Sequence, residues 1–377
     1  MKRFIFILII VFITYFSKPL WEDTAQEIIP STIKDPVINV INISKNYIND
    51  NFSVDKLSKE LKLIFSTSEN SSLNSNDTKE NQAKLNPPKN ELFSINNIEL
   101  NDSKKEVEDT YGEPKRSSLN EYNRTWNTYH EDYKGFIMVS YDENKKVSGL
   151  FTNQDLVNSS TKVKLGSSKE MVREEIGTPE SIMRKGGVNY ELDNNETYDL
   201  FQTDQSYITV FYDKHNNNTV TAIQIINKNM EKKKEKLFAD PSDELNEGFK
   251  YQLFDLTNAT RVKHELPVLD WDEKISKTAE KHSLDMAKNQ YFSHTNLNGK
   301  NISGRMEEDN IDFITAGENL AFGQFSSIFA HQGLMNSLGH RKNIMNKNYH
   351  KLGIGIAFDK NSQPYFTENF YSDSSSP

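Results

Sequence analysis

The N-terminus of the chain joins a short basic start to an unbroken apolar run. Lys2 and Arg3 precede FIFILIIVFITYF, residues 4–16, which at about 1.5 Å per residue reaches only about 20 Å, the length of a signal peptide. The apolar character resumes in a PLW segment that ends at Trp21, and no pair of small residues suited to cleavage follows the run. This pattern predicts a signal or membrane anchor over residues 1–21, retained as a single-pass anchor. A cleaved leader and a secreted chain are the alternative.

Residues 22–90 form a spacer on the far side of the anchor, outside the cytoplasm by the positive-inside rule. Apolar positions at helical spacing predict a short amphipathic helix within residues 36–66; they are Val54, Leu57, Leu61 and Ile64. Residues 66–90 are rich in Ser, Asn and Lys and contain a double proline near their end. Such a stretch buries too little apolar area to offset its ordering entropy, which predicts a disordered linker.

An internal repeat follows the linker. LNDSKKEVEDTYGEP (100–114) aligns with LGSSKEMVREEIGTP (165–179) at a constant offset of 65. Downstream, GFIMVSYD (135–142) and SYITVFYD (206–213) read as matching strands. We therefore expect two tandem helix-plus-sheet repeats, residues 91–155 and 156–229.

The repeat also predicts where its helices start and stop. Ser103 with Glu106 and Ser167 with Glu170 have the spacing of a capping box. Gly112 and Gly177 stand where a helix C-cap requires positive φ, and a proline two residues later prevents the helix from continuing. These residues have a structural explanation, so no chemistry is assigned to them.

A charged segment, residues 230–243, separates the repeats from the last part of the chain. Its lysines offer a contact for an anionic envelope polymer or membrane, but a charge run favours a solvated helix or linker. Beyond it, Phe249, Leu253 and Leu256 predict one amphipathic helix. A second helix is predicted where Ile275, Ala279, His282 and Met286 share a face, which makes His282 a core residue rather than a ligand.

The last third of the chain carries five motifs in order: YFSHTNLNGKNISGRM, AGENLAFG, GLMNSLGHRKNIMN, HKLGIGIAF and PYFTENFY. This series resembles a bacterial member of the CAP superfamily, the SCP-like cysteine-rich secretory, antigen 5 and pathogenesis-related proteins. The resemblance implies a CAP domain over residues 244–377 folded as an α-β-α sandwich, with strands at Leu352–Phe358 and Pro364–Phe370. The repeats resemble the CAP-associated domain of bacterial members, which implies a binding or positioning role. The expected fold class is thus α+β and multidomain.

The resemblance also implies a ligand-binding cleft. The histidine of FSHT is His294, the acid of GEN is Glu318, and the histidine of GHR is His340. Ser337 stands where many eukaryotic members place a second glutamate, and Leu334 where a tryptophan is common. One carboxylate therefore remains in the expected cleft.

Two neutral imidazoles and a carboxylate can hold a divalent metal such as zinc, with a position left open for water. His294, His340 and Glu318 are thus the candidate metal ligands, although Glu318 can equally brace its loop by pairing with a histidine. The usual signs of catalysis are missing, because the chain contains neither an HExxH motif nor a GxSxG elbow. His331 and His350 flank the GHR segment and could approach the cleft, but they are expected to face solvent or to pack locally.

Composition narrows the remaining functions. The 377 residues carry a net charge of −9 and include no cysteine, which excludes disulfides and thiolate sites and disfavours nucleic acid as a partner. We expect a membrane-anchored, non-catalytic binding module at the cell envelope, with an envelope or protein partner for the repeats. The alternative is a metal-dependent envelope hydrolase that uses the same cleft on a peptide or wall substrate.

Overall fold

The computed structural model describes residues 85–192 and 197–374. The predicted anchor and the predicted helix within residues 36–66 lie outside these ranges, as does most of the predicted linker. Within them, no helix is long and apolar enough to cross a membrane.

The N-terminal region, residues 91–229, is built around one seven-stranded antiparallel sheet in the order β2-β3-β4-β5-β11-β10-β9. Its first half contains β1 (Phe93–Ile95), α5 (Lys104–Tyr111), β2 (Arg116–Leu119), β3 (Thr125–Glu131), β4 (Lys134–Tyr141) and β5 (Val147–Thr152). Its second half contains β6 (Val157–Ser159), α6 (Lys169–Ile176), β7 (Ile182–Lys185), β8 (Val188–Glu191), β9 (Tyr198–Gln202), β10 (Ser206–Asp213), the 3₁₀ turn η1 (Lys214–Asn216) and β11 (Thr219–Asn227). Short pairs β1-β6 and β7-β8 complete the region.

The helix boundaries test the capping predictions. Ser103 caps α5 in a reciprocal capping box with Glu106, as expected. The box predicted at Ser167 is wrong, because α6 begins one residue later: Ser168 is the N-cap and accepts a hydrogen bond from the backbone N–H of Met171. The Ser167 hydroxyl instead accepts a hydrogen bond from a backbone N–H in the preceding turn.

The helix stops behave as predicted. Gly112 and Gly177 end α5 and α6 with φ of 76° and 110°, a region that disfavours residues with a Cβ.

The charged segment between the two regions is only in part the solvated helix or linker expected there. Residues 228–233 form α7 (Lys228–Lys233), and its Glu231 is buried in an ion pair with Lys185 of β7. Glu231 also accepts a hydrogen bond of 2.6 Å from the Tyr122 hydroxyl. The segment is therefore fastened by a buried carboxylate to β7 and to the turn between β2 and β3, while Lys232 and Lys233 remain exposed.

The C-terminal region, residues 244–374, has a four-stranded sheet in the order β12-β14-β15-β13. Its elements are α8 (Asp243–Lys263), β12 (Asp270–Trp271), α9 (Glu273–Asn289), α10 (Ile302–Glu308), β13 (Thr315–Phe322), α11 (Ser327–Asn336), α12 (Leu338–Ile344), β14 (Lys351–Phe358) and β15 (Pro364–Ser372). Both predicted helices and both predicted strands are confirmed.

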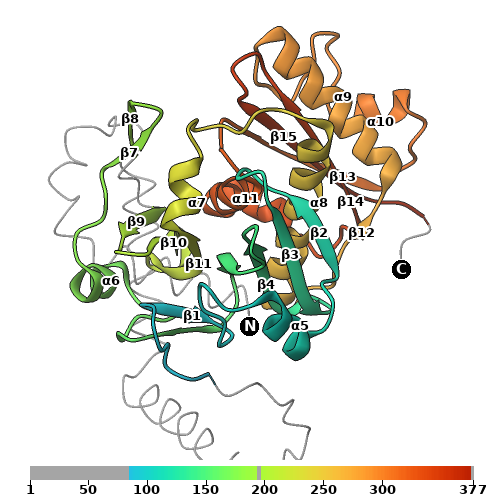
Figure 1. Cartoon of the computed structure of the whole chain (residues 1–377). Helices are drawn as coiled ribbons and strands as arrows, with labels where there is room; N and C mark the ends of the chain where they lie inside the picture. The colour runs from blue at the N-terminus through green and yellow to red at the C-terminus, as the bar shows by residue number, and fades with distance from the viewer. Residues whose placement is uncertain (1–84, 193–196, 375–377) are drawn as a thin grey trace, which may run out of the picture. The chain divides into compact units, whose positions relative to one another are not determined.

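Strand β14 explains how helices cover both faces of this sheet (Figure 1). Gly353 and Gly355 bring the backbone of α9 so close that a Cβ on either glycine would clash with it. On the opposite face, Leu352, Ile354 and Ile356 join the core that contains Leu253 and Phe249 of α8. Because side chains alternate along a strand, this pattern of glycine and branched residues produces the expected α-β-α sandwich.

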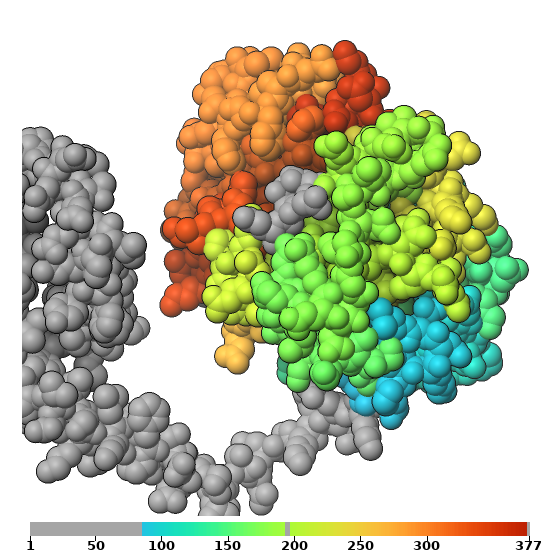
Figure 2. All heavy atoms as spheres, turned by 90° about the vertical axis from the view of Figure 1, so that its left-hand side faces the viewer, coloured from blue at the N-terminus to red at the C-terminus, as the bar shows by residue number. Residues whose placement is uncertain are grey.

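The two regions share a hydrophobic core. One face of the seven-stranded sheet packs with α8 and α11, and Figure 2 shows segments of the two regions directly against each other. The fully buried members of this interface are Trp126, Phe136, Met138, Phe151, Phe211, Ala222, Leu256, Ala259 and Ile328. The other face of the sheet is covered by α5, α6 and β1. Each region therefore has an interior of its own, and a further core joins the two regions.

The contact between α8 and β2 leaves no room for an added methyl group, so a glycine-to-alanine substitution tests it. Alanine normally stabilises a helix interior over glycine by up to about 1 kcal/mol, but a Cβ at Gly248 of α8 would collide with the carbonyl oxygen of Leu119. Gly248→Ala should therefore destabilise the protein by about 1–3 kcal/mol, measured by denaturant unfolding.

Gly333 of α11 is the matched control, because a Cβ there meets nothing within 4 Å. Gly333→Ala should leave stability unchanged or raise it. Stabilisation by both substitutions would show that α8 does not lie directly on β2.

Candidate functional site

The predicted cleft residues come from three separate elements. His294 lies in the loop after α9, Glu318 on β13 and His340 on α12. The side chain of His294 is 58% exposed, whereas that of Glu318 is only 2% exposed. The loop thus presents an imidazole at the surface, directly above a buried carboxylate.

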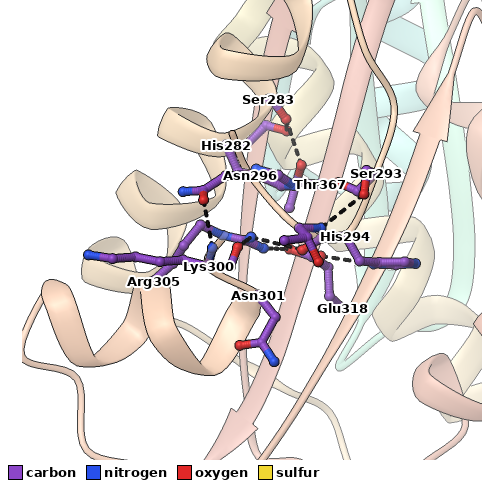
Figure 3. A network of polar contacts seen from close by, with 12 residues as sticks. His282, Ser283, Ser293, His294, Asn296, Lys300, Asn301, Arg305, Glu318 and Thr367 are labelled. Atoms are coloured by element: carbon purple, nitrogen blue, oxygen red, sulfur yellow. Dashed lines mark hydrogen bonds and ion pairs between the residues drawn. The ribbon is translucent and has the colours of Figure 1, made fainter. Parts of the chain in front are cut away.

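Glu318 is held at both of its oxygens. Oε1 lies 2.9 Å from Nδ1 of His294, and Oε2 forms an ion pair with the buried guanidinium of Arg305 on α10. Figure 3 shows these three side chains in one polar network. The contacts favour the bracing role that the sequence left open for Glu318, because the carboxylate has no oxygen without a partner.

This pairing also orients the imidazole of His294. A carboxylate oxygen only accepts hydrogen bonds, so Nδ1 carries the proton and donates it to Glu318. In the neutral ring Nε2 then has the lone pair, and more than half of the side chain is open to solvent. His294 is therefore fixed in the tautomer that can bind a metal ion or a hydrogen-bond donor through Nε2.

His340 is half-buried on α12. Burial lowers its pKa, and the charge of the nearby His294 lowers it further. Both effects keep His340 neutral to lower pH than a free histidine. That His340 faces His294 across one cleft stays a prediction.

Ser337 lies at the junction of α11 and α12, where its side chain makes no capping hydrogen bond. Within the described ranges, no three or more His, Asp or Glu side chains are arranged to hold a metal ion. Metal binding by His294, His340 and Glu318 stays a prediction.

A second buried network fixes α12 against the sheet. The side chain of Asn319 donates to the backbone oxygen of His340 at 3.2 Å and to Glu368 at 3.0 Å, and accepts from Asn343 at 2.9 Å. Thr257 of α8 donates to the other oxygen of Glu368. Burial raises the pKa of Glu368 to about 7, so a carboxyl that the sequence analysis did not single out carries a proton through much of the acid range.

The arginine of the GHR motif points toward the N-terminal region. Arg341 pairs with Asp213 at the end of β10, through contacts of 2.9 and 3.1 Å. The side chain of Asn336 adds a hydrogen bond to the backbone oxygen of Tyr212. The helix that carries His340 is therefore also fastened to the N-terminal region.

The remaining histidines have structural roles where the contacts are clear. His282 is buried in the core, as predicted, and its Nε2 donates to the backbone oxygen of Ser293. His331 is also buried, against the hydroxyl of Thr260, and burial lowers its pKa to about 3. His331 thus packs locally, one of the two positions that the sequence allowed.

Family comparison agrees with this architecture. Residues 100–237 match the CAP-associated N-terminal family, and residues 254–370 match the cysteine-rich secretory protein family. The chain is a CAP-domain protein with a CAP-associated N-terminal domain, as its motifs indicated.

Two relatives from Bacillus subtilis (strain 168) align with it. The uncharacterized membrane protein YlbC is 28% identical over 283 residues, which covers 70% of this chain and 80% of YlbC. The uncharacterized protein YkwD is 39% identical over 108 residues, 29% of this chain and 42% of YkwD.

Two solved structures share the fold across both regions. An extracellular protein with an SCP domain from Bacillus anthracis str. Ames has a TM-score of 0.62 and 23% identity, covering 73% of this chain and 94% of its own. A cysteine-rich secretory protein from Staphylococcus aureus subsp. aureus Mu50 has a TM-score of 0.59 and 16% identity, covering 73% and 91%. Both alignments extend well beyond the CAP domain, so the fold of the N-terminal region is shared as well.

The protonated state of Glu368 predicts a pH effect on stability. Its pKa is raised from 4.5 to about 7 by burial, so its contribution is fully present below about pH 4.5 and is lost as pH rises toward 7. Gln keeps the amide oxygen for Asn319 and faces Thr257 with its NH₂ group, and it does not ionise. Glu368→Gln should match the wild type at pH 5 and be more stable at pH 8, by up to about 3 kcal/mol.

Denaturant unfolding at the two pH values measures this difference. Glu307→Gln, at an exposed position of α10, is the control and should show no such pH-dependent gain. Equal pH profiles for wild type and Glu368→Gln would mean that Glu368 is ionised in the folded protein.

Proposed function

We propose that this CAP-domain protein is a non-catalytic binding module held at the outer side of the cell membrane, and that His294 and His340 form its recognition site. The observation that supports this most directly is the state of Glu318. A general base must be free to accept a proton from water or substrate, but both oxygens of Glu318 are engaged by His294 and Arg305. The geometry therefore favours binding over the hydrolase alternative.

A divalent cation such as zinc is the ligand that we propose for the two imidazoles. In metal sites, the ligating histidine commonly donates its other N–H to a carboxylate, which fixes the ring and raises its basicity. The pairing of His294 Nδ1 with Glu318 has this form. His294 and His340 would then be the ligands, with Glu318 as the outer partner, and the remaining positions would be open to water or to a donor from an envelope molecule.

The location rests on the N-terminus and on one relative. Residues 1–21 have the basic start and apolar run of an anchor, and YlbC, which aligns over most of its length, is named a membrane protein. We propose a single-pass anchor with the folded part extracytoplasmic, connected through residues 22–90.

The CAP-associated region has, on this proposal, a positioning role. Both faces of its sheet are occupied, one by the CAP domain and one by its own helices. Any envelope or protein partner of the repeats would therefore contact loops and edges rather than a sheet face.

Zinc titration calorimetry of the full-length protein tests the recognition site. His294→Ala and His340→Ala should each remove most of the binding, and affinity should fall as pH drops below about 6.5, where a model histidine becomes protonated. Because burial lowers the pKa of His340, the contribution of His340 to zinc affinity should be lost only at lower pH. Neither substitution should cost much stability, since one side chain is exposed and the other half-buried.

His264→Ala is the matched control, because this exposed histidine follows α8, outside the cleft. Zinc binding that survives both cleft substitutions would reject the metal site. A large fall in melting temperature without a change in zinc binding would make His340 a core histidine.

Fractionation tests the anchor. We expect the mature protein in the membrane fraction with its N-terminal residues intact, as determined by N-terminal sequencing. A soluble protein that begins after about residue 17 would show that the leader is cleaved.

A further inference from the structure

An exposed apolar patch lies on the CAP domain beside the recognition site proposed above. Its four side chains are Leu284 on α9, Phe292 and Leu297 in the loop after α9, and Phe322 at the end of β13. They are 41%, 50%, 64% and 36% exposed, respectively. The same loop carries His294, two residues after Phe292, so the patch and the recognition site share one segment of chain.

The members of this apolar patch are neighbours rather than isolated residues. The ring centroids of Phe292 and Phe322 lie 6.0 Å apart, and both rings contact that of Tyr365, with centroid distances of 6.5 and 4.3 Å. The backbone of Leu297 is hydrogen-bonded to the hydroxyl of Tyr291, the residue before Phe292. Single exposed apolar side chains are common on soluble proteins, whereas a cluster of them marks an interaction surface.

The apolar patch lies on the side of the CAP sheet that carries α9. Met286 and Ala287 of α9 pack there with Leu320 of β13 and with Tyr365. The opposite side of the sheet carries α8, which together with α11 contacts the N-terminal region. Figure 1 shows α9 on the outer side of the CAP domain. The core shared by the two regions therefore leaves the patch uncovered.

Charged side chains border the apolar patch. Lys288 is exposed and lies one helical turn after Leu284. A lysine can keep its methylene groups against an apolar surface and extend its ammonium group into water or lipid headgroups. Asp285 lies on the same helix, where its carboxylate accepts hydrogen bonds from Asn289 and from the Tyr291 hydroxyl. Shallow insertion of the patch into a lipid surface leaves these charges at the level of the headgroups.

We propose that the apolar patch docks on the lipid bilayer in which the chain is anchored, an inference that rests on the anchor proposed for residues 1–21. Residues 22–84 separate this anchor from the described part of the chain, and at about 3.5 Å per residue they can span at most about 220 Å. The patch can therefore reach the membrane, and the shared chain keeps the membrane at high effective concentration. Amphipathic surfaces with Phe and Leu at the centre and Lys at the edge enter the boundary between headgroups and acyl chains by about 5–10 Å.

Docking in this way brings the recognition site to the membrane surface. His294 follows Phe292 by two residues, and its side chain is 58% exposed. Its imidazole then lies close to the lipid headgroups. The ligand of the recognition site is accordingly a molecule found at the membrane surface rather than in the outer parts of the envelope.

The absence of cysteine allows one fluorescent label to be attached at a chosen position. We would label Leu297→Cys with a polarity-sensitive fluorophore and reconstitute the full-length chain in lipid vesicles. The emission should shift to the blue. A quencher attached to the lipid near its headgroup should reduce the emission more strongly than one near the end of the acyl chain, because the insertion is shallow.

Val268→Cys is the matched control for the label. Val268 is also an exposed apolar residue, at 42%, but it precedes β12, which lies at the opposite edge of the sheet from β13. The label at this position should show neither the blue shift nor the quenching, which excludes insertion driven by the fluorophore itself.

A second substitution tests the aromatic part of the patch. In labelled Leu297→Cys, Phe292→Ser should lower the ratio of docked to free protein about fivefold, because a half-exposed phenylalanine no longer transfers from water to lipid. Ile314→Ser is its control, since Ile314 is 73% exposed but lies at the other end of β13 from Phe322. It should leave the quenching unchanged, and equal melting temperatures would confirm that both variants are folded.

Vesicle flotation separates failure of the anchor from failure of the docking surface. Protein that does not float with the vesicles would reject the anchor and this proposal with it, whereas flotation without quenching at position 297 would reject the docking surface alone. A blue shift that rises with the ratio of protein to lipid, without quenching by lipid, would assign the patch to contact with a second copy. Removal of metal ions with EDTA should leave the quenching unchanged, so the result does not depend on the proposed zinc site.

Discussion

A buried carboxylate needs a partner, and this requirement organises much of the molecule. Removing one member of such a pair leaves an uncompensated buried charge, at a cost of about 3–5 kcal/mol. The two members of each pair come from different elements, so each pair joins separate segments of the chain. The pairs are Glu318 with Arg305, Asp255 with Arg116, Glu231 with Lys185, Asp213 with Arg341 and Asp199 with Arg173.

Three of these pairs help to hold the two regions and the segment between them in place. Asp255 of α8 receives an arginine from β2 at 3.0 Å, and Asp213 of β10 receives the arginine of the GHR motif. Glu231 fastens the connecting segment. Burial of the shared hydrophobic core provides most of the free energy that holds the two regions together, but apolar burial is not directional. The ion pairs fix the orientation of one region on the other. The position of α12, which carries His340, consequently depends on residues from both regions.

Local signals in the sequence were sufficient for helices α5, α8 and α9 and for the matching strands β4 and β10. The cap at Ser103 and the stop at Gly112 were readable because capping chemistry depends on a few neighbouring residues. The same logic failed by one residue at Ser167, where Ser168 satisfies the same requirement. The grouping of His294 with Glu318 and His340 came from the family resemblance, since no local pattern relates residues on three elements.

The side chains that hold the site residues in place could not be predicted from local signals or from the resemblance. Arg305 was visible only as one cation within a motif, because its burial and its ion pair arise from tertiary packing. The shared core did leave a signal in β4. Its successive residues Phe136, Ile137, Met138 and Val139 are all apolar and fully buried, which indicates a strand covered on both faces. The pattern did not indicate that the CAP domain packs on the second face of this sheet.

The shared core has a practical consequence for work with fragments. A chain cut near residue 244 would release α8 and α11 with Leu256, Ala259 and Ile328 facing water, and the remaining N-terminal fragment would expose Trp126 and its neighbours. Contiguous apolar patches of this kind promote self-association. Poor solubility of either half would then result from the loss of the other half. An inactive fragment would say little about the chemistry of the intact protein.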